Sequence, residues 1–213
     1  MRGNGLREEY AQRRAQILEP LATRLVEHLQ GNLEGIGRID RVSARAKGVD
    51  RFLAKAAKAL EDGGAKYEHP FEQIQDLIGA RIIVFYKQDV DVVAEMVERY
   101  YRRIERKDLI PESEAEFGYF GKHFILAVPQ DAVDDEADRD KTPKFFELQV
   151  KTLFQHAWSE ASHDLAYKPG EPLSPLNKRQ VAFTAAQAWG ADQMFEQLHT
   201  ELNGAPEVRA STG

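Results

Sequence analysis

The sequence predicts a single domain of the α/β or α+β class, and three of its features lead to this prediction. Short runs rich in β-branched and aromatic residues, such as 80–86 and 145–151, are typical of strands. The segments around these runs repeat apolar residues at helical spacing. The chain has 213 residues, of which 42% are hydrophobic, and this suits one domain with a large core. We expect three strands among five or six helices within residues 1–204, followed by a flexible tail at 205–213.

Two long helices are expected before the first strand. Residues 6–30 repeat apolar groups at helical spacing, and Gly31 ends the pattern. Residues 41–61 carry a second pattern of the same kind, which Gly63-Gly64 ends. A short helix is expected at 70–75.

The middle of the chain is expected to hold one strand and one helix. The run from Ala80 to Tyr86 predicts the strand. Asp89 is expected to cap the helix, which ends near Tyr101. Residues 104–120 are polar and weakly periodic, so we interpret them as a long loop.

The second half of the chain predicts two strands followed by two helices. The strands are expected at 123–128 and 145–151, with an acidic, exposed loop at 129–144 between them. Thr152 is expected to cap a helix that runs to about Ala166. Ser174-Pro175 begins the last helix, 175–203, in the usual order of cap and proline.

Composition excludes several classes of protein. The chain contains no cysteine, which rules out disulfides, zinc thiolate sites and cysteine nucleophiles and fits a reducing cytoplasm. The N-terminus lacks an apolar signal core, and no run of eighteen apolar residues is present. We therefore expect a cytoplasmic protein that does not cross a membrane. The net charge of −6 argues against broad coating of nucleic acid, yet residues 38–58 hold seven basic and two acidic side chains.

Part of this basic segment predicts a phosphate clamp. Lys47, Arg51, Lys55 and Lys58 follow one another at helical spacing within 41–61, and Arg45 flanks them. Cations held in a row on a rigid element can bind a triphosphate and offset charge as a phosphoryl group leaves. A solvated charged face is the alternative reading of the same pattern.

Two carboxylates on expected strands form the second candidate element of a site. Asp76 precedes one strand, and Glu147 shares one face of another strand with Gln149 and Lys151. Two carboxylates on neighbouring strands can hold one Mg²⁺ through oxygen ligands, which suits attack on a nucleotide phosphate. The alternatives are that Asp76 caps a turn and that Glu147 lies on an exposed sheet edge.

A glycine- and aromatic-rich loop precedes the strand that begins at His123. Gly118, Tyr119 and Gly121 suggest a loop on which a flat base stacks against the Tyr119 ring. An ordinary glycine turn with packed aromatics is equally compatible with these residues. We expect no metal role for His156 or His163 and a core position for Trp158 and Trp189.

Taken together and in order, these segments resemble the synthetase domain of the RelA/SpoT family, specifically its short single-domain alarmone synthetases. The resemblance covers residues 38–168. It rests on five sets of residues: Arg45, Lys47 and Lys55; Asp76, Gly79 and Arg81; Gly118, Tyr119 and His123; Glu147, Gln149, Lys151 and Thr152; and Trp158, His163, Tyr167 and Lys168.

The resemblance implies a mixed β-sheet flanked by helices, related to nucleotidyltransferases, and an ATP:nucleotide 3′-pyrophosphotransferase activity. The β,γ-pyrophosphate of ATP would move to the 3′-hydroxyl of an acceptor, usually GDP or GTP. Asp76 and Glu147 are the implied catalytic and Mg²⁺-binding residues. The implied ATP-binding residues are Arg45, Lys47, Arg51, Lys55 and Arg81. The implied acceptor-binding residues are Tyr119, Lys122, His123, Gln149, Lys151 and His163.

Departures from the family pattern leave the acceptor open. Gly121 and Lys122 stand in the loop where serine is usual, and Ser162, Ala166 and Arg51 also depart from the pattern. Relatives that modify adenine nucleotides or the 3′ end of tRNA therefore remain alternatives, the latter with Arg99, Arg102, Arg103, Arg106 and Lys107 as a candidate patch. A toxic relative would need a separate antitoxin protein. A catalytically inactive nucleotide-binding regulator is the third reading, and the helix at 175–202 leaves a homo-oligomer open.

Overall fold

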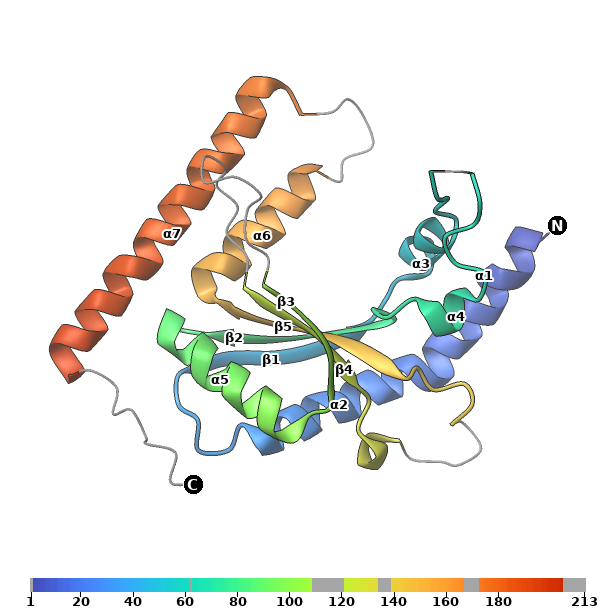
Figure 1. Ribbon diagram of the computed structural model, residues 1–213, viewed down its shortest axis with the longest axis horizontal. Coiled ribbons are helices and arrows are strands. Elements are labelled where there is room, and N and C mark those ends of the chain that lie inside the picture. Colours follow the sequence, from blue (N-terminus) through green and yellow to red (C-terminus); the bar gives the residue numbers. More distant parts are fainter. Residues whose placement is uncertain (1, 62, 109–120, 134–138, 167–172, 205–213) are drawn as a thin grey trace.

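Five strands form one mixed sheet in the computed structural model, which describes residues 2–61, 63–108, 121–133, 139–166 and 173–204 (Figure 1). The strand order is β1-β2-β5-β4-β3. β2 and β5 pair in parallel, and the other neighbours pair antiparallel. The mixed sheet that the family resemblance implies is thus confirmed, whereas the expectation of three strands is wrong, because β1 and β3 were not predicted as strands. The strands are β1 (Ile39–Ala46), β2 (Ile78–Val84), β3 (Arg103–Asp108), β4 (Lys122–Ala127) and β5 (Phe145–Thr152).

The two faces of this sheet are covered differently. Helices α2 (Glu19–Asn32) and α5 (Lys87–Tyr100) lie on one side, and α6 (Leu153–Ala166) lies on the other (Figure 1). Alternation along β2 and β5 turns Ile82 and Leu148 into the core beneath α2 and α5. The other elements are α1 (Arg2–Arg13), the π-helical turn η1 (Arg14–Leu18), α3 (Val49–Ala56), α4 (Pro70–Gln73), the 3₁₀ turn η2 (Gln130–Ala132) and α7 (Pro175–Asn203).

The expected helix at 41–61 is wrong in its first half. Residues 39–46 form β1, which pairs with β2 so that Val42 lies opposite Ile82. The segment also alternates polar and small apolar residues at a period of two, and pairing with β2 selects the extended form. Helix α3 starts only after Gly48. The expected row of cations is therefore divided between the end of a strand and a short helix.

Three smaller expectations are also corrected. Residues 103–108 form the edge strand β3, although residues 104–108 were expected in a loop. The N-cap of α5 is Tyr86, and Asp89 sits at the third helical position, where its carboxylate accepts a hydrogen bond from the Tyr86 backbone N–H. Trp189 was expected in the core and is 48% exposed on α7. Across the described residues, no helix combines the length and apolarity that a membrane crossing requires.

Helix α7 is anchored to the sheet by a buried polar contact. Thr152 closes β5, and its hydroxyl donates to the carboxylate of Asp192 at 2.5 Å. The same hydroxyl accepts the backbone N–H of Gln155 at 3.1 Å, so Thr152 caps α6 as expected. Thr152 and Asp192 are both almost fully buried. The strand that carries Glu147, the start of α6 and the middle of α7 are therefore held by one hydroxyl group.

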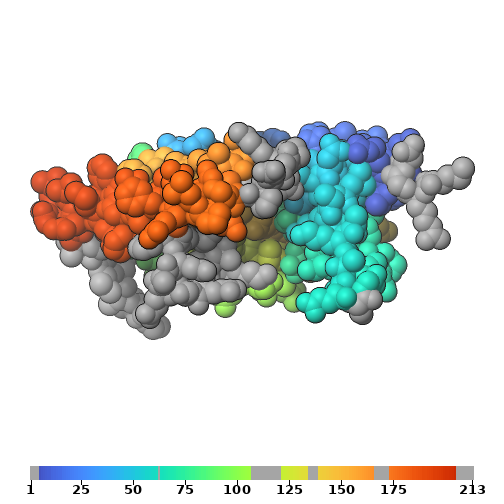
Figure 2. All heavy atoms as spheres, turned by 90° about the horizontal axis from the view of Figure 1, so that it is seen from above, coloured from blue at the N-terminus to red at the C-terminus, as the bar shows by residue number. Residues whose placement is uncertain are grey.

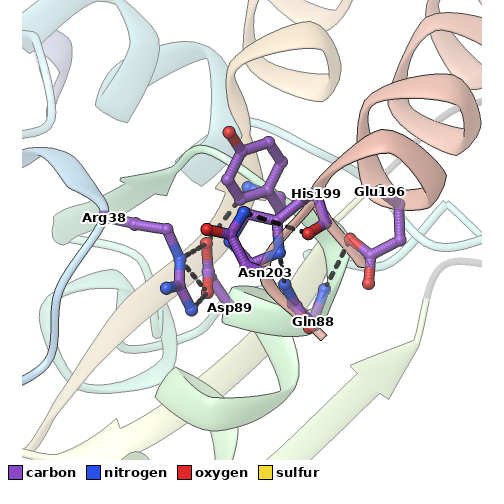
Figure 3. A network of polar contacts seen from close by, with 7 residues as sticks. Arg38, Gln88, Asp89, Glu196, His199 and Asn203 are labelled. Carbon is purple, nitrogen blue, oxygen red and sulfur yellow. Dashed lines mark hydrogen bonds and ion pairs between the residues drawn. The ribbon is translucent and has the colours of Figure 1, made fainter. Parts of the chain in front are cut away.

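A second polar network fixes the far end of α7 (Figure 3). The guanidinium of Arg38 bonds both carboxylate oxygens of buried Asp89. From α7, Glu196 accepts the Gln88 backbone N–H at 3.2 Å, and the His199 ring lies 2.8 Å from the Gln88 amide nitrogen. The C-terminal part of α7 is thus tied to the first turn of α5.

Thr152→Val is expected to lower the free energy of unfolding by about 1–3 kcal/mol, because it removes the buried hydroxyl that bonds both the Asp192 carboxylate and the Gln155 N–H. Urea denaturation monitored by circular dichroism measures this change. Thr184→Val is the matched control, because the Thr184 hydroxyl is exposed and bonds only a carbonyl of its own helix in the described contacts. Equal effects of the two substitutions would contradict the anchoring role.

Candidate active site

A cleft opens on the face of the sheet opposite the main core, where β2 and β5 run side by side. Their parallel register places Gly79 next to Glu147 and Arg81 next to Gln149. The cleft has a volume of about 330 Å³. Its lining residues are Arg45, Ala46, Lys47, Gly48, Arg51, Asp76, Gly79, Ala80, Arg81, Glu147 and Gln149. The cleft therefore contains both predicted carboxylates, four predicted cations and one predicted amide.

Asp76 lies between two lysines at one end of this cleft. Its carboxylate is 2.9 Å from the Nζ atom of Lys47 and 2.9 Å from that of Lys55. Burial alone would raise the pKa of Asp76, but the hydrogen bonds and charges of the two lysines outweigh it and hold the pKa below its ordinary value. Asp76 is consequently ionised at neutral pH, and two flexible cations lie within reach of anything that binds beside it.

Glu147 faces the cleft from the middle of β5. Burial would raise its pKa, but a hydrogen bond and charge from His123, together with a hydrogen bond from Gln149, lower the pKa despite the nearby charge of Asp76. The His123 ring nitrogen Nδ1 lies 3.2 Å from the Glu147 carboxylate. In the part of the chain that the structure describes, the buried atoms His123 Nε2 and Gln149 Oε1 have no hydrogen-bond partner. Such atoms are costly unless a bound molecule satisfies them.

A second ion pair connects the cleft to helix α6. Arg81 on β2 pairs with Glu160 at 2.8 Å. Next to it, the buried ammonium of Lys151 donates to the Ser159 hydroxyl at 3.1 Å. Burial lowers the pKa of Lys151 to about 8, with Arg81 acting in the same direction and Glu160 and Glu147 opposing it.

Comparison with known proteins agrees with these features of the cleft. Residues 44–172, more than half of the chain, match the family described as the region found in RelA / SpoT proteins. The chain belongs to the RelA/SpoT family. It is 26% identical over 192 residues to GTP pyrophosphokinase YjbM of Bacillus subtilis (strain 168), which covers 84% of this chain and 86% of that protein. The family resemblance seen in the sequence is confirmed.

Solved structures share the fold of this RelA/SpoT protein. The protein smu.1046c from Streptococcus mutans UA159 aligns with a TM-score of 0.70 and 23% identity, covering 88% of this chain and 96% of that one. Small alarmone synthetase 1 from Bacillus subtilis, in a structure with its product pppGpp, aligns with a TM-score of 0.67 and 23% identity. That alignment covers 85% of this chain and 92% of that one.

Some residues expected in the RelA/SpoT site lie elsewhere. Lys122 was expected to bind the acceptor, but it lies on the opposite face of β4 from His123 and pairs with Asp91 of α5. Neighbours on a strand point to opposite faces, so Lys122 and His123 cannot both enter the cleft. His163 is exposed on α6 and does not line the cleft. Tyr119, together with Tyr167 and Lys168, lies outside the described residues.

The candidate tRNA patch and Glu160 also differ from the sequence-based expectation. Arg103 and Arg106, from the candidate tRNA patch, both pair with Glu98, at 2.6 and 3.0 Å. Part of that patch is therefore neutralised. Glu160 was not predicted as a site residue, because its charge indicates a surface position and nothing local in the sequence names Arg81 as its partner.

Lys151 is expected to make stability depend on pH. Its pKa of about 8 in the folded chain is below the ordinary value of 10.5 that the unfolded chain keeps, so the unfolded state binds more protons between these values. Stability relative to a Lys151→Met variant should therefore rise as the pH increases from about 8 to about 10. Urea denaturation of both proteins across this range measures it. A difference that does not change with pH would contradict the shifted pKa.

Proposed function

We propose that this chain transfers the β,γ-pyrophosphate of ATP to the 3′-hydroxyl of a guanine nucleotide, GDP or GTP, and so makes (p)ppGpp. The observation that carries the proposal is the pairing of two ionised carboxylates, Asp76 and Glu147, in one cleft lined by cations. The RelA/SpoT membership supports it. So do the likeness to a protein named GTP pyrophosphokinase and the fold shared with a small alarmone synthetase solved with pppGpp.

The cationic end of the cleft suits the triphosphate of the donor. Lys47 and Lys55 both contact Asp76, and phosphate oxygens offer the two ammonium groups more negative charge than one carboxylate does. Arg45 and Arg51 line the same end, and Arg81 extends the positive charge toward α6. These cations hold the β- and γ-phosphates in place and offset the charge that develops on them during transfer.

The carboxylate of Glu147 suits the role of general base. Its lowered pKa keeps it unprotonated at neutral pH, and His123 orients it from β4. Glu147 accepts the proton of the acceptor 3′-hydroxyl while the 3′-oxygen forms a bond to the β-phosphorus. The bond between that phosphorus and the oxygen that bridges it to the α-phosphate breaks, and AMP leaves with this oxygen. Gln149, whose buried amide oxygen has no partner among the residues that the structure describes, contacts the acceptor nucleotide.

The donor set of the cleft fits Mg²⁺ brought in with the nucleotide. Among the described residues, no three acidic or histidine side chains gather closely enough to hold a metal ion by themselves. Asp76 and Glu147 supply two carboxylates, and Mg²⁺ is commonly held by one or two carboxylates together with phosphate oxygens and water. Mg²⁺ held there would withdraw charge from the phosphates that are transferred.

A transfer assay with γ-³²P-labelled ATP and Mg²⁺ tests the proposal. GDP, GTP, ADP, AMP and deacylated tRNA are offered in parallel, and the labelled products are separated. Label on GDP or GTP is the expected result. Label confined to adenine nucleotides or tRNA would overturn the proposed acceptor while keeping the reaction, and label on none of them would overturn the reaction itself.

A further inference from the structure

Tyr10 of α1 lies directly beneath the phosphate-binding end of the cleft. Its side chain is fully buried, and it belongs to a helix outside the segment 44–172 that matches the family. Tyr10 is not among the residues that line the cleft, so it does not reach a bound nucleotide there. We propose that Tyr10 is a positioning residue that fixes the backbone of Lys47 and thereby the ATP-binding end of the cleft.

The hydrogen bonds of the Lys47 backbone are the first observation. The Tyr10 hydroxyl donates to the Lys47 carbonyl at 2.8 Å. The Lys47 N–H donates to the carbonyl of Leu77, also at 2.8 Å, and Leu77 directly follows Asp76. Both backbone polar groups of Lys47 are thus bound. Its N–H bonds the residue before β2, and its carbonyl bonds α1. Because the Lys47 ammonium contacts Asp76, this turn sets the geometry of a phosphate-binding cation and a catalytic carboxylate together.

The packing of the Tyr10 ring is the second observation. It stacks on Phe52 of α3 with ring centroids 3.8 Å apart and planes at 4°. Phe52 is fully buried and also contacts Phe71 of α4. Helix α3 carries Arg51 and Lys55, so the ring supports the helix that presents these cations while the hydroxyl holds the turn before it.

The π-helical turn that follows α1 explains how one continuous helical segment provides this support. Tyr10 and Leu18 are both fully buried and lie eight residues apart. On a straight α-helix that spacing would turn them about 80° away from each other. The wider turn η1, at Arg14–Leu18, reduces this offset, so that Tyr10 packs under the cleft while α2 packs on the sheet. Such π-turns inside helices are frequent near functional sites.

The Tyr10 hydroxyl is suited to act as a hydrogen-bond donor rather than as an acid or a base. Burial raises the pKa of Tyr10 above its ordinary value, so the hydroxyl stays protonated at neutral pH, where the cleft carboxylates are ionised. Its bond to the Lys47 carbonyl is therefore constant, and the role of Tyr10 is geometric rather than acid–base.

Tyr10→Phe tests this inference, which rests on the proposed function, because the substitution removes the hydroxyl and keeps the stacked ring. The KM for ATP is expected to rise about fivefold to tenfold, the range that loss of one buried hydrogen bond produces, with the KM for GDP unchanged. Tyr101→Phe is the matched control. Tyr101 is also buried and hydrogen-bonded, but its partners, Asn32 and His28, do not line the cleft.

The outcomes separate a positioning role from a general structural one. An unchanged KM for ATP in Tyr10→Phe would overturn the proposal. An equal rise in Tyr101→Phe, or a Tyr10→Phe chain that does not fold, would also overturn it, since the hydroxyl would then act on the whole domain. If the wild-type chain transfers no label to any acceptor, the proposed function fails. The affinity of a non-hydrolysable ATP analogue, measured by calorimetry in the same variants, then decides the role of Tyr10.

Discussion

Replacing Glu147 by glutamine is expected to lower kcat for pyrophosphate transfer by about 10²–10⁴-fold, the range that a positioned general base contributes. The substitution keeps the size of the side chain and one acceptor oxygen but removes the carboxylate that takes the proton of the 3′-hydroxyl. The Lys47, Arg51 and Lys55 cations remain in place, so ATP affinity should change little. Steady-state transfer to GDP measures kcat, and calorimetry with a non-hydrolysable ATP analogue measures affinity.

Glu95→Gln is the matched control for this experiment. Glu95 lies exposed on α5, on the far side of the sheet, and its substitution should leave both kcat and ATP affinity unchanged. Transfer that survives in Glu147→Gln at the wild-type rate would remove Glu147 from the catalytic role. A loss of nucleotide binding as large as the loss of rate would instead make Glu147 a binding residue.

Gly121→Ala is expected to destabilise the chain by about 1–3 kcal/mol, the range typical of overpacking. Gly121 is buried at the start of β4, against β5. A Cβ atom there would lie 2.1 Å from the Val150 carbonyl oxygen and 2.6 Å from the Lys151 side chain. Because the contact is with backbone, it cannot be relieved by a rotamer change and must displace β4 from β5. His123 and Glu147 face each other across these two strands, so kcat should fall together with stability.

Urea denaturation measures the stability change, and Gly190→Ala provides the control. Gly190 lies inside α7 with open space where a Cβ would stand, so alanine should stabilise the chain by about 0.5–1 kcal/mol. A stable and fully active Gly121→Ala variant would contradict the tight approach of the two strands. The expected loss of stability would also explain why this chain has glycine at position 121, where it departs from the family pattern.

The parts of the site that follow from local pattern could be predicted from the sequence. Alternation along one strand places Glu147, Gln149 and Lys151 on one face, and the structure confirms that arrangement. The same alternation puts Lys122 on the face opposite His123. The sequence pattern therefore already argues against Lys122 as a residue of the cleft. Thr152 as a helix cap was likewise readable from local residues.

The parts that depend on contacts between distant segments could not be predicted. Residues 39–46 fit a helix and a strand equally well, and only pairing with β2 decides between the two. The bond from Tyr10 to Lys47 spans 37 positions, and that from Thr152 to Asp192 spans 40. No spacing rule connects such residues, because their proximity is produced by the packing of helices on the sheet.

Following the fate of the α-phosphate most directly tests the central claim, that this cleft transfers pyrophosphate rather than a single phosphoryl group. ATP labelled with ³²P at the α-position is incubated with the chain, GDP and Mg²⁺, and the labelled nucleotides are separated over time. Our account predicts labelled AMP in a one-to-one ratio with a GDP product that carries a 3′-pyrophosphate, and formation of both products about 10²–10⁴-fold more slowly with Glu147→Gln. Labelled ADP in place of AMP, or AMP formed without a modified acceptor, would contradict it.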